Sequence, residues 1–173
     1  MSDTIKIITY PDRVLRTQAE TIKNIDEDLQ NLIDTMGDTM YAAPGIGLAA
    51  NQVGELKRIF VYDLSPKENG RQLSVLINPE IVQAEGKIVH EEACLSVIDF
   101  SSDVARASQV KVRGYDRHGK QVDIEAEGLL AICLQHEIDH LNGTLFIDHI
   151  SSLKRSLYKK KLRKMLKESE NDA

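Results

Sequence analysis

The sequence has few of the features that mark secreted and membrane proteins. Its 173 residues include only two cysteines and four prolines, and aromatic residues make up 5%. Two cysteines do not build a disulfide framework, and although Cys94 and Cys133 could pair, we expect both thiols to be reduced. The first residues show no basic region followed by a long apolar run. We therefore expect neither a signal peptide nor a membrane anchor, and a cytoplasmic location.

Internal repeats, low-complexity segments and linker-like stretches are absent as well. With 42% apolar residues the chain can build one sizeable core, so we expect a single domain over residues 1–173. The formal net charge of −5 hides an asymmetry. Residues 1–150 carry 24 acids and 14 bases, whereas residues 151–167 carry eight bases and no acid. We expect a basic C-terminal helix at 151–167 and a disordered tail at 168–173.

Apolar residues recur at helical spacing in two further segments. In residues 25–41 they fall on one face of a helix, which should end before Pro44. The same spacing returns in residues 128–142, and Gly143 is well placed to end that helix.

Short runs rich in β-branched residues lie between these two helices. They predict strands at 58–63, 73–77, 81–84, 87–90, 109–115 and 121–125. Turn-like residues at 85–86 and 117–120 predict two hairpins. The pattern predicts an α+β fold, in which antiparallel or mixed sheets pack around the central helix 128–142, with an N-terminal and a C-terminal amphipathic helix.

The predicted central helix contains the run His-Glu-Ile-Asp-His at residues 136–140. Histidines four residues apart project from one helical face, so His136 and His140 can reach one metal ion, and Glu137 lies beside them to take a proton from water. The simpler alternative is a charged helix face with two ordinary histidines. Apolar flanks weigh against it, because buried histidines and acids need a compensating partner such as a metal ion.

A catalytic metal site with two histidines needs a third protein ligand. Cys133, Cys94, His90, His149 and downstream acids are the candidates. Cys133 is seven residues from His140, about 10 Å along the axis at about 1.5 Å per residue, so the two cannot share an ion. We expect Cys133 to line a pocket above the metal. Cys94, in a segment with β-like flanks, becomes the leading candidate.

Residues 45–52, Gly-Ile-Gly-Leu-Ala-Ala-Asn-Gln, alternate small and apolar side chains. The simple interpretation is a glycine-rich loop between the first long helix and the sheet. The alternative is a backbone that approaches an extended peptide closely, in strand-like pairing. The side-chain amide of Gln52 would then donate to an oxyanion that develops in a water-excluded site.

Three motifs, in this order and spacing, make the sequence similar to the peptide deformylases. They are residues 45–52, residues 92–96 (Glu-Ala-Cys-Leu-Ser) and residues 135–141 (Gln-His-Glu-Ile-Asp-His-Leu), and the similarity extends over residues 5–155. The resemblance implies a metal-dependent hydrolase that removes the formyl group from the N-terminal formylmethionine of nascent polypeptides and releases formate. Two alternatives remain: an inactive relative that binds nascent chains, and, from the helix motif alone, a zinc peptidase.

The resemblance also implies roles for individual residues. Three metal ligands are implied, namely Cys94, His136 and His140. The ion is Fe²⁺ in the cell, and Zn²⁺ or Ni²⁺ can occupy the same site. Glu137 is implied as general acid and base, Gln52 and the backbone NH of Leu95 as oxyanion donors, and Arg106 as the partner of Glu92. Substrate contacts are expected from Gly45, Ile46, Gly47, His90, Ala93, Leu129, Ile132 and Cys133.

Four residues depart from the family's usual pattern. Ala93 replaces a glycine, Ile98 a proline, His90 an apolar residue, and Ser101 an arginine that touches the bound peptide in several bacterial members. A methyl group at 93 is harmless in an ordinary strand but unfavourable at positive φ, and loss of the proline leaves residues 99–104 less restrained. We expect an active enzyme whose peptide preference or efficiency differs from the common type.

The basic segment 151–167 carries an apolar stripe of five residues, namely Leu153, Leu157, Leu162, Met165 and Leu166. A solvated helix packed on the body by that stripe is the simple interpretation. Contact with ribosomal RNA is the alternative, because eight positive charges favour it through counterion release and deformylases of similar length use this helix in that way. We expect the ribosome as a partner, no DNA, no membrane and a monomeric protein.

Overall fold

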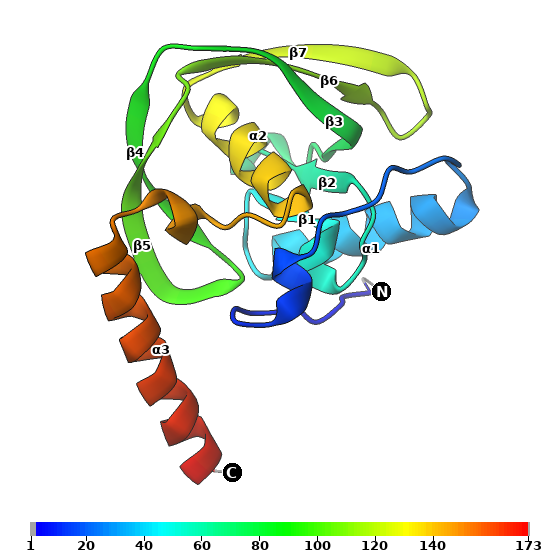
Figure 1. Ribbon diagram of the computed structural model, residues 1–173. Helices are drawn as coiled ribbons and strands as arrows, with labels where there is room; N and C mark the ends of the chain where they lie inside the picture. The colour runs from blue at the N-terminus through cyan, green and yellow to red at the C-terminus, as the bar shows by residue number, and fades with distance from the viewer. Residues whose placement is uncertain (1–2, 173) are drawn as a thin grey trace.

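The computed structural model describes residues 3–172 of the chain (Figure 1). Its helices are α1 (Glu27–Ala42), α2 (Gly128–Leu141) and α3 (Ser152–Asn171). Its strands are β1 (Gly47–Ala49), β2 (Ile59–Tyr62), β3 (Ser74–Glu85), β4 (Ile88–Cys94), β5 (Val97–Arg106), β6 (Gln109–Tyr115) and β7 (Gln121–Glu127). Short 3-10 helices are η1 (Arg13–Arg16), η2 (Ala50–Val53), η3 (Lys67–Asn69) and η4 (Phe146–His149).

The strands form two antiparallel sheets around a central helix. Five of them pair in the order β1-β2-β3-β6-β7, and β4 and β5 form a separate two-stranded ribbon. Figure 1 shows α2 in the middle of the molecule, with the β4–β5 ribbon on one side and the five-stranded sheet around it. The predicted α+β architecture is confirmed. Within residues 3–172, β1 and β4 each pair on one side only, so both have a free edge there.

Helix α2 is the buried centre of the fold. Its residues 131–134 are all buried, as are Ile138 and Leu141. The helix ends as the sequence predicts, because Gly143 has a φ of +77°, where side chains are disfavoured. A Cβ on this glycine would also lie 2.6 Å from the backbone oxygen of Arg16, so no other residue fits.

Helix α1 covers one face of the five-stranded sheet. Asp26 caps it, since its Oδ1 accepts a hydrogen bond from the Leu29 amide at 2.9 Å. The apolar stripe expected from the sequence is buried against β1 and β2, through Leu29, Ile33, Met36 and Met40. Each of these side chains stabilises the fold by roughly 1.5 to 3 kcal/mol through its burial.

The strand predictions at 73–77 and 81–84 correspond to one long strand, β3, with register shifts in between. Asn78, with a φ of 51°, and Pro79 interrupt the apolar pattern at that point. The hairpin predicted at 85–86 is wrong, because β3 pairs with β6, and β4 pairs with β5. The hairpin at 117–120 is confirmed by the pairing of β6 with β7.

Strand β5 was not predicted from the sequence. The buried positions in its second half are Ser102, Val104 and Arg106. Because two of these three are polar, the alternation of apolar and polar residues that indicates a strand is lost. Residues 99–104, expected to be less restrained without a proline at 98, lie inside β5. Residues 101–104 are paired with β4, whereas Asp99, with a φ of 54°, and Phe100 lie in an irregular part of the ribbon. An irregularity separates the pair Ala93–Ser101 from the next pair along the ribbon.

Helix α3 packs on the body through part of its length. Tyr158 and Leu162 are buried, whereas Leu153 and Leu157 are 69% and 59% exposed, so the expected apolar stripe is only partly packed. The Lys161 ammonium donates a hydrogen bond to a backbone oxygen of β5 at 2.9 Å. The helix runs through Asn171, so residues 168–171 of the expected tail are helical, and residue 173 lies outside the described residues.

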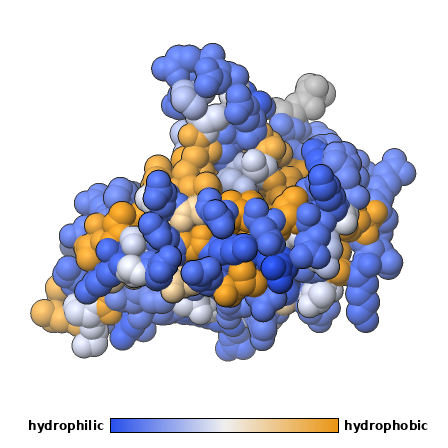
Figure 2. All heavy atoms as spheres, turned by 90° about the horizontal axis from the view of Figure 1, so that it is seen from above, coloured by the Kyte–Doolittle hydropathy of each residue, from blue (hydrophilic) through white to orange (hydrophobic). Residues whose placement is uncertain are grey.

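The face seen from above is mainly polar (Figure 2). Figure 2 shows hydrophilic side chains over most of the upper face, with hydrophobic ones gathered in its middle. Among residues 3–172, no helix has the length and apolar character that crossing a membrane requires.

Candidate active site

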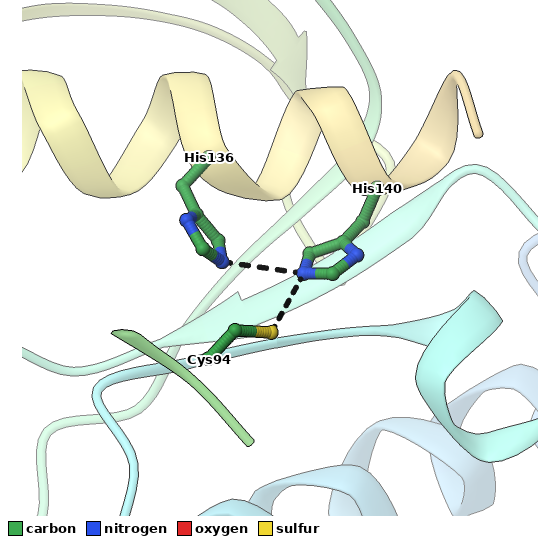
Figure 3. Close-up of side chains that lie close together, drawn as sticks. All are labelled: Cys94, His136 and His140. Atoms are coloured by element: carbon green, nitrogen blue, oxygen red, sulfur yellow. Dashed lines mark hydrogen bonds between the residues drawn. The ribbon is translucent and has the colours of Figure 1, made fainter. Parts of the chain in front are cut away.

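Three metal-ligand atoms meet between α2 and the end of β4. Figure 3 shows His136 and His140 projecting from one face of α2, with the side chain of Cys94 pointing toward them from below. The Cys94 Sγ lies 3.3 Å from His140 Nε2, which lies 3.2 Å from His136 Nε2. All three donor atoms lie within 4.8 Å of one another. His90 and His149, considered as ligands from the sequence, are not part of this cluster.

The spacing of these donors suits a metal ion. Bonds of roughly 2.0 to 2.3 Å in a tetrahedral site place neighbouring nitrogen and sulfur donors about 3.3 to 3.6 Å apart. The observed separations of 3.2 and 3.3 Å are close to that value. One thiolate and two imidazoles suit Fe²⁺ and Zn²⁺ alike. The residues present therefore fit a divalent metal ion with one or more open positions.

A buried ion-pair network fixes the orientation of His136. Glu92 Oε1 lies 2.9 Å from His136 Nδ1, and Arg106 holds both oxygens of the same carboxylate at 2.8 and 2.9 Å. Burial would raise the pKa of Glu92, but hydrogen bonds from Arg106 and His136 lower it to about 2. An ionised Glu92 can only accept hydrogen bonds, so His136 Nδ1 carries the proton. The lone pair of Nε2 is then free to bind a metal ion.

The network continues away from the cluster. Arg106 Nη1 donates to Asp139 Oδ2 at 2.5 Å, and this oxygen also lies 2.8 Å from His149 Nε2. The arginine expected to brace Glu92 thus joins the strand of Cys94 to the helix of the histidines. Since the Arg106 side chain is only 5% exposed, these ion pairs are little screened by solvent.

Glu137 lies beside the three donors and is 4% exposed. Burial raises its pKa to about 7, so the carboxyl group can exchange a proton near neutral pH. Its Oε2 is buried and has no hydrogen-bond partner within the described structure. Gly47 of β1 makes room for this side chain, because a Cβ there would lie 2.6 Å from Glu137 Oε1.

The side-chain amide of Gln52 is directed at the cluster. Its Oε1 accepts from the Ala49 amide at 2.9 Å, which leaves the NH2 group turned toward β4. That group donates to Ser96 Oγ at 3.0 Å and lies 3.6 Å from Cys94 Sγ. Gln52 is 1% exposed, so its donors act in a site that excludes bulk water.

A cavity of 330 Å³ opens in front of these groups. Its walls contain every residue expected to contact substrate, namely Gly45, Ile46, Gly47, His90, Ala93, Leu129, Ile132 and Cys133. Cys94, Leu95, Gln52, His136 and Glu137 also line it. The cavity lies between the free edges of β1 and β4. The backbone of Ala93 has no positive φ, so its methyl group fits an ordinary strand.

Three contacts in the site were not predicted from the sequence. Glu92 was paired with Arg106 but not with His136, and no role was assigned to Ser96, although Glu92 and Ser96 lie two positions before and after Cys94. Strand alternation turns residues two apart to the same side and could have indicated Glu92. The contact of Gly47 with Glu137 joins residues 90 positions apart, and no local signal points to it.

Comparison with known proteins agrees with the arrangement. A family model described as polypeptide deformylase matches residues 4–156. The chain is 57% identical over 159 residues to the peptide deformylase of Thermodesulfovibrio yellowstonii, covering 92% of this chain and 96% of that protein. It is 53% identical over 165 residues to the peptide deformylase of Syntrophobacter fumaroxidans, with 95% and 97% covered.

Solved structures show the same similarity in three dimensions. The peptide deformylase of Legionella pneumophila is 46% identical and superposes with a TM-score of 0.89, over 96% of this chain and 97% of that one. The peptide deformylase of Ehrlichia chaffeensis in complex with actinonin is 39% identical, with a TM-score of 0.87 and coverage of 95% and 98%. Fold and sequence therefore agree over nearly the whole chain.

Proposed function

The chain belongs to the polypeptide deformylase family, and from this premise we propose that Cys94, His136 and His140 hold its metal ion and that Glu137 moves the proton. It is a metal-dependent hydrolase that removes the formyl group from the N-terminal methionine of nascent polypeptides and releases formate. One observation carries the assignment of residues: the ligand atoms of Cys94, His136 and His140 lie within 4.8 Å of one another, beside a cavity that Cys94, His136 and the buried Glu137 line.

A bound divalent ion supplies Lewis-acid activation of water and of the formyl oxygen. Glu137 takes the proton of the attacking water, because its pKa of about 7 places it near the operating pH. The same carboxyl group then gives that proton to the departing nitrogen. Loss of formate and release of a free amine return Glu137 to its starting state.

The oxyanion that forms on the formyl carbon needs preorganised donors. Gln52 provides one, because its NH2 group faces the cluster and its carbonyl oxygen is held by the Ala49 amide. The backbone NH of Leu95 is the second donor in this proposal, since Leu95 lines the cavity directly after Cys94. Each such donor contributes a rate factor of about 100 to 1000.

The substrate backbone binds between the two free strand edges. An extended peptide laid between β1 and β4 finds unpaired NH and C=O groups on both sides. Gly45, Ile46 and Gly47 form one wall, and His90 and Ala93 belong to the other. Leu129, Ile132 and Cys133 of α2 supply the apolar surface for the methionine side chain.

Release of formate from a formyl-Met-Ala peptide tests this function. We expect turnover by the parent protein loaded with Fe²⁺ without oxygen, and loss of turnover in Glu137→Ala. Glu125→Ala, at an exposed site on β7, is the matched control and keeps the parent rate. Absence of formate release by the loaded parent refutes the assignment. Internal cleavage of an unformylated peptide indicates a peptidase instead.

We propose Fe²⁺ as the ion used in the cell. One thiolate and two imidazoles are suitable ligands for Fe²⁺, but they suit Zn²⁺ equally well. Metal analysis of protein purified without oxygen decides the point: iron at about one ion per chain supports the proposal, and zinc with full activity contradicts it.

We also propose a monomeric cytoplasmic protein of one domain that meets the ribosome through α3. Figure 1 shows α3 projecting from the body, and its lysines and arginines are largely exposed. Because Lys161 donates to β5, the test replaces Lys159, Lys160 and Lys164. Loss of salt-dependent ribosome cosedimentation in this triple variant supports the proposal, and unchanged cosedimentation contradicts it.

A further inference from the structure

A second groove opens beside the active-site cavity, on the face of the β4–β5 ribbon that is turned toward α3. It has a volume of 290 Å³, and its walls come from β4, β5 and α3. Glu91 lines both this groove and the active-site cavity. The two spaces therefore adjoin at Glu91, and a chain that leaves the active site along β4 comes beside the groove.

The groove carries an unusual pair of charges. Glu91 and Asp103 lie directly opposite each other on the antiparallel ladder, and both are exposed. Like charges in that relation destabilise a sheet. Within residues 3–172, neither acid forms an ion pair of 4.0 Å or less with a cation, although Lys154 lines the same groove. The pair does not serve the stability of the ribbon.

The length of the substrate fits this position. A peptide on the free edge of β4, with its formyl end at Cys94, runs antiparallel to the strand. Three strand residues lead from Cys94 to Glu91, which is roughly 10 Å at about 3.3 Å per residue. The third or fourth substrate residue therefore comes level with Glu91.

We propose that this groove binds the third and fourth residues of the nascent chain and that Glu91 and Asp103 select basic side chains there. The inference rests on the proposed function and extends it to peptide preference. Phe100 and Leu157 supply apolar surface in the groove for the stem of a lysine or arginine. Ser101, small and exposed, leaves room for the head group beside the acids.

The experiment compares formyl-Met-Ala peptides extended by Arg-Arg, Gln-Gln or Glu-Glu. We expect kcat/KM to be about tenfold higher for the Arg-Arg than for the Glu-Glu peptide, with Gln-Gln between them. Glu91→Gln combined with Asp103→Asn should bring the ratio to about one. The matched control combines Glu85→Gln with Glu125→Gln, which changes the net charge equally on the other sheet and keeps the parent ratio.

Because ratios on two peptides are compared within each variant, partial loss of folded enzyme does not affect the result. A parent ratio near one overturns the inference, and so does a ratio that survives the groove substitutions. A ratio that falls equally in the control also overturns it, because net charge would then be its cause. The unextended formyl-Met-Ala amide ends before Glu91. Failure to deformylate it would refute the proposed function instead.

Discussion

Gly47→Ala tests how far catalysis depends on the position of the Glu137 carboxyl group. A methyl group at residue 47 would lie 2.6 Å from Glu137 Oε1, whereas ordinary contacts begin at 3.4 Å. The carboxylate must then move by roughly 0.8 Å, and a misplacement of about 1 Å costs about 100-fold in rate. Gly47 has no positive φ, so alanine fits its backbone without strain. We expect kcat to fall about 100-fold while the metal ligands keep their positions.

Formate release under saturating formyl-Met-Ala peptide measures this change, together with metal content and thermal unfolding. Gly70→Ala is the matched control: it has a φ of +74°, and nothing lies within 4 Å of its added Cβ. It should lose some stability but little activity, which separates strain in the fold from displacement of Glu137. A fully metal-loaded Gly47→Ala enzyme within threefold of the parent kcat would refute the reasoning.

Three further predictions follow from polar contacts of single side chains. Gln52→Ala should lower kcat about 100- to 1000-fold in the formate assay at unchanged metal content, and a preserved kcat would exclude Gln52 as oxyanion donor. Glu92→Gln should weaken metal binding about 10- to 100-fold in competition with a chelator, and equal affinity would show that the carboxylate does not support His136. Burial would raise the pKa of Asp63, but hydrogen bonds from Ser65 and Tyr41 lower it overall. The ionised Asp63 therefore stabilises the folded state, and this contribution is lost as pH falls below about 4. Urea unfolding at pH 6 and pH 3 should show a smaller pH effect in Asp63→Asn, and an equal effect would contradict this.

The central helix and its chemistry were predictable because their signals are local. Histidines four residues apart, apolar positions at helical spacing and the terminal Gly143 all act within a few turns. Cys133 could also be excluded as a metal ligand from the rise per residue of a helix alone. The family resemblance rested on three such runs, and the matched family model and solved structures bear it out.

Strand partners were less accessible, because register depends on residues far apart. The turn at 85–86 has the residues of a hairpin, yet β3 and β4 belong to different sheets. In β5, Arg106 points inward although arginine is usually exposed. Its burial is explained by its ion pairs with Glu92 and Asp139. Burial of such a charge depends on partners from β4 and α2, and no short window of sequence contains them.

The sequence by itself determined the chemical groups and the helix that presents two of them, because periodicity places side chains on one face without knowledge of the fold. Only the tertiary structure decided that Cys94 faces those histidines at 3.3 Å from His140, and that Glu137 has room because residue 47 is glycine. It also decided that Glu91 borders a second groove. These contacts depend on the packing of separate strands on α2, which many weak long-range interactions set together.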